Sequence, residues 1–355
     1  MIVVGPLPGG AGGIAVVLET LVASQLAERY ELLQVGTHRD SRRLGKAWQA
    51  LGGIARGCWL LVVRRPDLVY LLTSSGFSLR RKAVVAAVAR LARTPYVVHV
   101  HAGGFERYYR EAPRWEQWVI RRTLSRAALV IALSPSLEPR MQSIVECRTT
   151  SIPNPVEIPL EAARLDSAPA QIVSLGRLGA GKGSHTLVQA LVELGTHHPG
   201  ARLVLAGDGD LVSVAAEARR LGVSDRVELP GWIGPEERAR TLATASVFAL
   251  PSREEGMPVA LLEAMAYGLP SVVSPVGGIP DVFEDGRHGY FVPPDDPQAL
   301  ANRLGALLDH PDVAREMGTS ARRHATERYA TDVVVALIGD AFAATLADRD
   351  TAQPT

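Results

Sequence analysis

Residues 246–274 read SVFALPSREEGMPVALLEAMAYGLPSVVS. Both ends of this stretch are short, mostly apolar runs that favour strands, at Ser246–Leu250 and Ser271–Ser274. Between them, Pro258–Tyr267 is rich in Ala, Leu and Met, residues that favour a helix. A strand, a helix and a second strand in succession are typical of a βαβ unit, whose strands lie parallel in one sheet. The stretch therefore predicts an α/β fold.

The same alternation of apolar runs and helical spacing extends along the whole chain, with helical stretches such as Ala15–Arg29 and residues 313–346. It is interrupted from Ile152-Pro-Asn-Pro-Val156 to Ala170, where four prolines indicate a junction between domains. We therefore expect two doubly wound domains, each built on a parallel sheet. The other expected strands are Ile2–Val4, Glu31–Val35, Leu68–Leu72, Tyr96–Val100, Leu129–Leu133, Thr150–Ile152, Gln171–Leu175, Arg202–Ala206, Arg226–Leu229 and Tyr290–Val292.

Length and charge narrow the class of protein. A chain of 355 residues fits two domains, and its formal net charge of +1 argues against a nucleic-acid binder. The charge is uneven, however, with +10 on residues 1–160 and −9 on the remainder. This asymmetry indicates either a polyanionic or membrane-surface partner for the basic half, or attraction between the two domains.

The two cysteines and the apolar runs indicate a cytoplasmic protein. Cys58 and Cys147 are isolated, so they form neither a disulfide framework nor a zinc site, and we expect no metal site. No apolar run approaches the roughly 20 residues that span a bilayer.

Two glycine-rich clusters point to phosphate binding. The first, Gly5–Gly13, lies between a strand and a helix, where backbone N–H groups can meet an anion. It lacks the dinucleotide fingerprint, which argues against an oxidoreductase, and the alternative is a turn without a ligand. The second cluster, residues 174–183, places Arg177 and Lys182 at a strand–helix junction, which suits a diphosphate. The alternative is that both cations are simply solvated.

Two carboxylates, Glu255 and Glu263, lie in the quoted stretch. Glu263 is surrounded in sequence by apolar residues, so its carboxylate needs a partner, and vicinal sugar hydroxyls would suit it. The alternatives are an internal salt bridge or helix cap for Glu263 and an exposed acidic loop for Glu254-Glu255.

These motifs resemble those of the retaining glycosyltransferases of sequence family four. The resemblance rests on GRLGAGKG (176–183), EEGMPVALLEAMAYGLP (254–270), GGIPD (277–281) and GYFVPPD (289–295), and it is specific over residues 171–308. IPNPV at 152–156 is similar to the family's IPNGV segment, with Pro155 in place of glycine. The resemblance implies the GT-B fold, in which two Rossmann-like domains face a central cleft.

Three segments follow from this organisation. Residues 1–155 are expected to form an acceptor-binding domain, and residues 156–330 a domain that binds the nucleotide-sugar donor. Residues 331–355 are expected to form a helix that packs back on the N-terminal domain, followed by a tail.

The resemblance also implies roles for individual residues. Arg177 and Lys182 would bind the diphosphate and neutralise the leaving group, so that neither a metal ion nor another cofactor is needed. Glu263 would accept hydrogen bonds from the ribose, Glu255 would contact the donor sugar near its 3-hydroxyl, and Gly12 and Gly13 would close over the phosphates.

One position departs from the family. The usual EGFG is EGMP here, and Pro258 has no N–H to offer. Backbone contacts to the donor are therefore expected from Gly256, Met257 or Val259.

Two histidines follow each other along one strand, in VVHVHAGG at residues 97–104. Alternation places His99 and His101 on the same face of the sheet. His101 is closer to the carboxyl end of the strand and matches the family's catalytic histidine, whereas His99 is expected to be a core residue.

The resemblance implies transfer with retention, by attack of the acceptor hydroxyl beside the leaving phosphate. The expected reaction moves a hexosyl or N-acetylhexosaminyl group from a UDP-linked donor to a saccharide or polyprenyl-linked acceptor in polysaccharide or glycolipid synthesis. The alternatives are a nucleotide-sugar epimerase and a non-catalytic nucleotide-sugar-binding subunit.

Basic and aromatic residues interleave in two N-terminal segments, residues 41–65 and 107–126. Such segments suit an anionic membrane surface, which would make the protein peripheral on the inner face of the plasma membrane. The alternative is a pair of ordinary helices with solvated basic faces. The residues concerned are Arg42, Arg43, Lys46, Trp48, Arg56, Trp59, Arg107, Arg110, Arg114, Trp115, Trp118, Arg121, Arg122 and Arg126.

Overall fold

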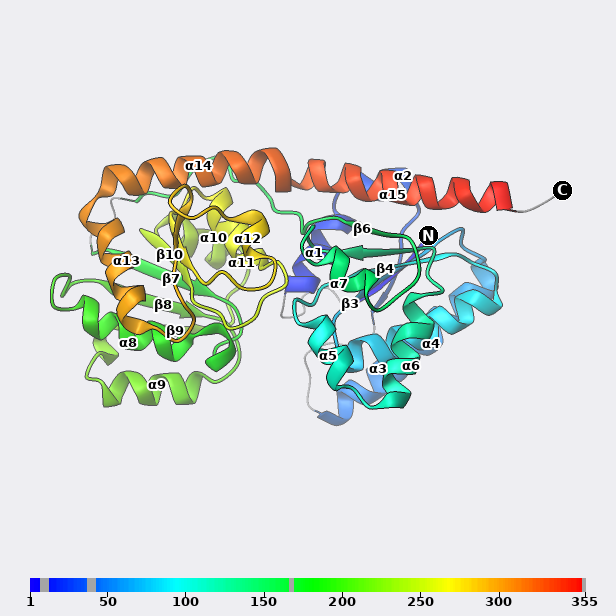
Figure 1. The fold of residues 1–355 in the computed structure, drawn as a ribbon, viewed down its shortest axis with the longest axis horizontal. Helices are drawn as coiled ribbons and strands as arrows, with labels where there is room; N and C mark the ends of the chain where they lie inside the picture. The colour runs from blue at the N-terminus through cyan, green and yellow to red at the C-terminus, as the bar shows by residue number, and fades with distance from the viewer. Residues whose placement is uncertain (7–12, 37–42, 166–168, 353–355) are drawn as a thin grey trace. The chain divides into compact units, whose positions relative to one another are not determined.

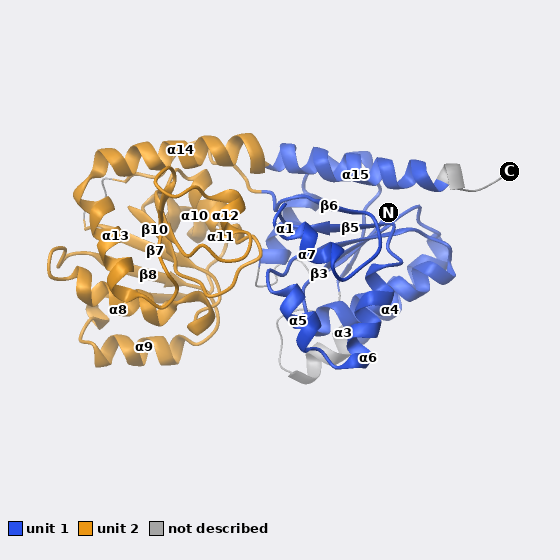
Figure 2. Cartoon of the chain, viewed as in Figure 1, with its two compact units in different colours: residues 1–155, 331–355 blue, residues 156–330 orange. Residues whose placement is uncertain are grey.

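The computed structural model describes residues 1–6, 13–36, 43–165 and 169–352. The chain divides into two compact units (Figure 2): unit 1 comprises Met1–Pro155 and Thr331–Thr355, and unit 2 comprises Val156–Ala330. These boundaries coincide with the segments expected from the sequence. The acceptor and donor roles of the two units remain predictions.

Unit 1 is built on a six-stranded parallel sheet in the order β2-β1-β3-β4-β5-β6 (Figure 1). All residues of β3 and β4 are buried, as expected for central strands covered by helices on both faces. Its strands are β1 (Ile2–Gly5), β2 (Leu33–Gly36), β3 (Val69–Thr73), β4 (Tyr96–Val100), β5 (Leu129–Ala132) and β6 (Thr149–Ser151). Its helices are α1 (Gly13–Val22), α2 (Leu26–Arg29), α3 (Arg43–Arg64), α4 (Phe77–Leu91), α5 (Phe105–Glu111), α6 (Arg114–Leu124), α7 (Glu138–Gln142) and α15 (Thr331–Ala352).

Unit 2 has a second six-stranded parallel sheet, in the order β12-β11-β10-β7-β8-β9. Its strands are β7 (Gln171–Leu175), β8 (Arg202–Ala206), β9 (Val227–Gly231), β10 (Val247–Leu250), β11 (Ser271–Val273) and β12 (Gly289–Phe291). Its helices are α8 (Ser184–Leu194), α9 (Leu211–Arg220), α10 (Pro235–Ala243), α11 (Val259–Ala266), α12 (Ile279–Val282), α13 (Pro297–Asp309) and α14 (Pro311–Tyr329), with the 3-10 turns η1 (Ala180–Lys182) and η2 (Ser224–Arg226).

Two helices expected to be continuous are interrupted. The first ends at Val22 and resumes at Leu26, because the Ser24 hydroxyl donates to the Leu21 carbonyl at 2.6 Å and accepts from the Leu26 N–H at 3.3 Å. The second is divided into α14 and α15 by Ala330, whose backbone is extended and forms a β-bridge with Val156.

Helix α15 packs within unit 1 although it comes last in the chain. The Phe342 ring lies edge-on to Tyr70 of β3 and to Tyr30, at centroid distances of 5.0 and 6.0 Å. Arg349 donates to the Asp67 carbonyl. No helix among the described residues is long and apolar enough to cross a membrane.

Each sheet has one place where neighbouring strands belong to halves that wind in opposite directions. This switch point lies between β1 and β3 in unit 1, and between β7 and β10 in unit 2. Ligands of such sheets bind at the carboxyl ends of the strands at the switch point. A site is therefore expected at the carboxyl ends of these strands in each unit.

Candidate active site

Lys182 and Glu255 meet at the switch point of unit 2. Lys182 ends η1, and its Nζ lies 2.5 Å from Oε1 of Glu255, in the loop after β10. The Ser252 hydroxyl donates to the same oxygen at 2.6 Å. Glu255 is only 7% exposed, so its carboxylate is buried with a cation and a hydroxyl donor as compensation.

Two glycines allow the loops around this pair to approach closely. Gly183 has φ of +69°, and a Cβ there would lie 2.3 Å from the Pro251 carbonyl oxygen. Gly277 has φ of +59°, and a Cβ there would lie 1.7 Å from the Glu255 carbonyl oxygen. A side chain at either position would force the loops apart and displace the ion pair.

Arg177 follows β7 and pairs with a residue that the sequence interpretation did not single out. Its Nη2 lies 2.9 Å from Oδ2 of Asp208, in the loop after β8. Asp208 stands between two glycines behind an apolar strand, and this context was the available signal. The Arg177 side chain is 71% exposed, so an incoming anion can readily replace Asp208 as its partner.

Glu263 on α11 forms an ion pair with Arg238 of α10, whose Nε donates to Oε2 at 2.9 Å. The internal salt bridge left open by the sequence is thus present. Burial raises the pKa of Glu263, and the Arg238 guanidinium opposes this shift. A role of Glu263 in ribose binding remains a prediction.

The loop between Glu255 and α11 contains the other expected donor contacts. The Gly256 carbonyl accepts a hydrogen bond from the Gly278 N–H at 2.9 Å. Met257 and Val259 are buried, and Pro258 occupies the N-cap position of α11. Glu263 therefore lies in the second turn of the helix. Contact of these residues with a donor remains a prediction.

In unit 1, the two histidines differ as the sequence indicates. His99 is fully buried in β4, and its Nδ1 lies 2.6 Å from the Tyr70 hydroxyl, which is the arrangement of a core residue. His101 follows β4 with its ring 4.1 Å from that of His99. The pKa of His101 is lowered to about 3, chiefly by burial; a hydrogen bond with Asn154 opposes the shift, and the charge of Lys82 adds to it. His101 is therefore neutral near pH 7. Its catalytic role remains a prediction, and Asn154 and Lys82 were not anticipated.

The first glycine cluster is described only in part. Gly12 lies outside the described residues, and Gly13 is the first residue of α1.

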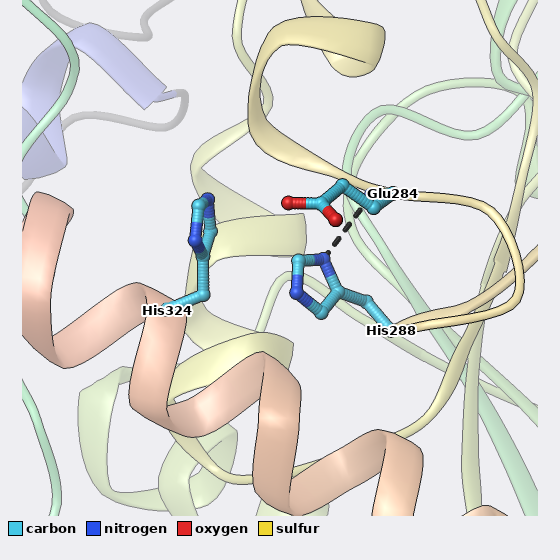
Figure 3. Close-up of side chains that lie close together, drawn as sticks. All are labelled: Glu284, His288 and His324. Carbon is cyan, nitrogen blue, oxygen red and sulfur yellow. Dashed lines mark hydrogen bonds between the residues drawn. The ribbon is translucent and has the colours of Figure 1, made fainter.

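A second group of ligating side chains in unit 2 consists of Glu284, His288 and His324 (Figure 3). The Glu284 backbone N–H donates to Nδ1 of His288 at 3.1 Å, so a neutral His288 carries its proton on Nε2. Burial, with a smaller contribution from His324, lowers the pKa of His288 to about 4. Nδ1 of His288 is thus occupied, its protonated Nε2 has no hydrogen-bond partner among the described residues, and its ring packs 4.9 Å from that of His324. This chemistry favours a packing contact over a cation site.

Two family models match the chain, one to each half. The model described as "Glycosyl transferase 4-like domain" matches residues 11–155, and "Glycosyl transferases group 1" matches residues 169–310. The second match includes Arg177, Lys182, Glu255 and Glu263.

Individual proteins give the same result. Glycogen synthase of Mycobacterium tuberculosis (strain CDC 1551 / Oshkosh) is 28% identical over 305 residues, which cover 82% of this chain and 71% of that protein. A GDP-mannose-dependent alpha-(1-6)-phosphatidylinositol monomannoside mannosyltransferase of Mycolicibacterium smegmatis is 33% identical over 220 residues, covering 60% and 57%. The solved structure of Anabaena HepE in complex with UDP-glucose has a TM-score of 0.78 at 20% identity and covers 97% of this chain and 99% of that one, which shows the shared fold. The chain therefore belongs to the glycosyltransferases of sequence family four and has the GT-B fold.

Proposed function

We propose that this glycosyltransferase acts with retention and moves a hexosyl or N-acetylhexosaminyl group from a UDP-linked donor to a saccharide or lipid-linked acceptor. The Lys182–Glu255 pair at the switch point of unit 2 carries the proposal. It places a cation and a carboxylate side by side, which are the groups that a sugar diphosphate needs for its phosphates and its hydroxyls.

Lys182 and Arg177 stabilise the leaving diphosphate. When the bond between the sugar C1 and the phosphate oxygen breaks, negative charge accumulates on the diphosphate, so both cations bind the transition state more strongly than the donor. Arg177 exchanges Asp208 for the diphosphate. The two cations supply the charge that a divalent metal supplies in other transferases, so we propose that no metal or other cofactor takes part.

Glu255 orients the donor sugar. Lys182 and Ser252 both contact its Oε1, which leaves Oε2 to accept a hydrogen bond from a sugar hydroxyl. The acceptor hydroxyl then attacks C1 on the face that the diphosphate leaves, and a phosphate oxygen takes its proton. His101 is neutral near pH 7, so it serves as a hydrogen-bonding group for the sugar and not as a general acid.

The choice of UDP follows the HepE complex with UDP-glucose, although the mycobacterial relative is named for GDP-mannose. A thermal-shift panel of UDP- and GDP-sugars tests this choice, because a ligand that binds the native state raises the melting temperature. Stabilisation by GDP-sugars alone would contradict it. Transfer that is lost in EDTA and restored by Mg²⁺ would contradict the metal-independent mechanism. Incubation of the donor alone tests for an epimerase, whose product would be an isomerised donor.

We further propose that unit 1 binds an anionic membrane surface through α6 and its neighbours. Trp115 and Trp118 are 55% and 63% exposed. Arg80 lies over the ring of Trp115, and Arg122 lies over that of Trp118. A cavity of about 970 Å³ beside α6 is lined by Arg114, Arg121, Arg122 and Arg126. On α3, Trp59 is 60% exposed, whereas Arg42 lies outside the described residues.

Co-sedimentation with vesicles tests the membrane proposal. We expect binding to vesicles that contain phosphatidylglycerol at low salt, and weaker binding at high salt or after Trp118→Ala. Equal binding to neutral vesicles, or none at low salt, would contradict it.

A further inference from the structure

Unit 1 has a pocket at its own switch point. It has a volume of about 370 Å³ and lies between the carboxyl ends of β1 and β3 and the first residues of α1 and α4. This volume suits a small organic ligand. Its described lining includes Gly13, Ser74, Ser78, Arg81 and Lys82.

The polar groups of this pocket suit an anion. Arg81 and Lys82 bring two cations, and α1 presents its N-terminal turn at residues 13–15. No carboxylate is among the described lining residues. A helix N-terminus alone would be weak evidence, but here it faces the same cavity as a buried lysine.

Lys82 is the strongest evidence for an anion. Its side chain is 1% exposed, and its Nζ donates to the Ser78 hydroxyl at 3.2 Å. The same hydroxyl oxygen accepts from the Ser74 N–H at 3.2 Å, so its own hydrogen can be donated to a ligand. Burial, with a smaller contribution from the charge of Arg81, lowers the pKa of Lys82 to about 7. An anion in the pocket would reverse this shift, because it stabilises the charged lysine.

We propose that this pocket binds a phosphate group of the acceptor, and hence that the acceptor is a phosphorylated sugar, polyol or lipid-linked saccharide. The inference rests on the proposed transferase function and deepens it, since it assigns a chemical class to the acceptor. Lys82 and Arg81 bind the phosphate oxygens, and the Ser78 hydroxyl is a further donor.

The chain permits a direct test because it has only three lysines, Lys46, Lys82 and Lys182. Lysine labelled with ¹³C and ¹⁵N gives three side-chain NMR signals, which single Lys→Met variants assign. Inorganic phosphate is titrated against sodium chloride at equal ionic strength. We expect a saturable shift of the Lys82 signal and an increase in the pKa of Lys82, also when UDP is already bound.

UDP serves as the probe for the donor site. We expect it to shift the Lys182 signal and to leave Lys82 unchanged. If UDP shifts Lys182 but phosphate does not shift Lys82, the anion pocket is wrong and the proposed transferase function stands. If phosphate shifts Lys82 but UDP leaves Lys182 unchanged, the donor assignment fails. If UDP shifts Lys82 and phosphate competes with it, the pocket belongs to the donor site, which overturns the acceptor assignment.

Two arginines of the same helix provide a matched pair of variants. Arg81 lines the pocket, whereas Arg90 lies in the last turn of α4 outside the lining. Arg81→Met should weaken phosphate binding roughly tenfold to a hundredfold, as expected for a lost charged hydrogen bond. Arg90→Met makes the same change in net charge and should leave the affinity within about twofold, because it acts only through the screened long-range field. Equal effects of the two variants would show that phosphate responds only to the general surface charge, which would contradict the proposal.

Discussion

The switch points of the two sheets are equivalent positions in the fold, but the cationic side chains at each have different surroundings. In unit 2, Lys182 pairs with Glu255, Arg177 pairs with Asp208, and Arg238 nearby pairs with Glu263. In unit 1, Lys82 and Arg81 line a pocket whose described residues include serines and a helix N-terminus but no carboxylate. The formal net charges, +8 for unit 1 and −7 for unit 2, follow the same division.

The difference shows two ways to prepare a site for an anion. Unit 2 compensates its cations internally, so a ligand has to exchange with an existing carboxylate partner. Unit 1 buries a lysine at an energetic cost, which its pKa of about 7 expresses, and a bound anion would recover that cost. The ion pairs of unit 2 hold its side chains in place before the ligand binds. The buried lysine of unit 1 instead makes the binding of an anion more favourable.

The largest effect is expected when the central pair of unit 2 is broken. Lys182→Met removes the cation that stabilises the leaving diphosphate, so kcat should fall roughly a hundredfold to a thousandfold. Arg220→Met is the matched control, because Arg220 forms an exposed ion pair with Glu217 on α9 of the same unit. A steady-state transfer assay compares the variants. Wild-type turnover in Lys182→Met would exclude Lys182 from the reaction.

Removal of Arg238 should leave the charge of Glu263 in unit 2 at an energetic cost, as burial does for the charge of Lys82 in unit 1. Arg238→Met leaves Glu263 buried without its cation, which should lower the free energy of unfolding of unit 2 by about 3 kcal/mol. Burial raises the pKa of Glu263, so lower pH protonates it and reduces the loss. Urea unfolding at pH 5 and pH 8 measures both effects. The double variant Arg238→Met/Glu263→Gln should recover much of the stability, and a loss independent of pH would contradict this explanation.

A third prediction concerns His101, which is uncharged near pH 7 in unit 1. The pKa of His101 is lowered to about 3, so between pH 6.5 and pH 3 the unfolded chain binds a proton that the folded chain does not. Stability from this residue is therefore complete above pH 6.5 and declines as the pH falls. When the pH is lowered from 7 to 5, the free energy of unfolding of His101→Gln should therefore fall by about 2 kcal/mol less than that of the wild type.

Urea unfolding of unit 1 across this pH range provides the measurement. His197→Gln, at an exposed histidine of unit 2, is the control and should follow the wild type. If the His101 variant loses stability in parallel with the wild type, His101 is not held neutral by the fold.

The sequence was sufficient for the fold because parallel strands are nearly continuous apolar runs between helices. All twelve expected strands are present, with ends that differ by at most two residues. The breaks at Ser24 and Ala330 were not predicted, since the first depends on a side-chain hydrogen bond and the second on a β-bridge to Val156, distant in the sequence.

The site was only partly predictable for a similar reason. Glu255 and Lys182 were identified from local motifs, but their contact at 2.5 Å requires two loops that are separate in the sequence. Asp208 and Lys82 were not identified: the only local signal for Asp208 is its place between two glycines after an apolar strand, and Lys82 stands in no recognisable motif. The importance of Lys82 comes from its burial, which the amphipathic pattern of α4 does not reveal.

The smallest effect is expected from the Arg177–Asp208 pair, which is more exposed than the Lys182–Glu255 and Arg238–Glu263 pairs. Asp208 holds Arg177 in the absence of a donor, but an ion pair of this exposure contributes about 1 kcal/mol or less. Asp208→Asn removes the competitor and one negative charge near the diphosphate, so UDP should bind up to about fivefold more tightly. Isothermal titration with UDP measures this change, and Asp312→Asn, which breaks a more exposed pair with Arg315, should not alter the affinity. Weaker binding in Asp208→Asn would show that Asp208 positions Arg177 for the ligand, and unit 2 would then depend on its carboxylates for orientation as well as for compensation.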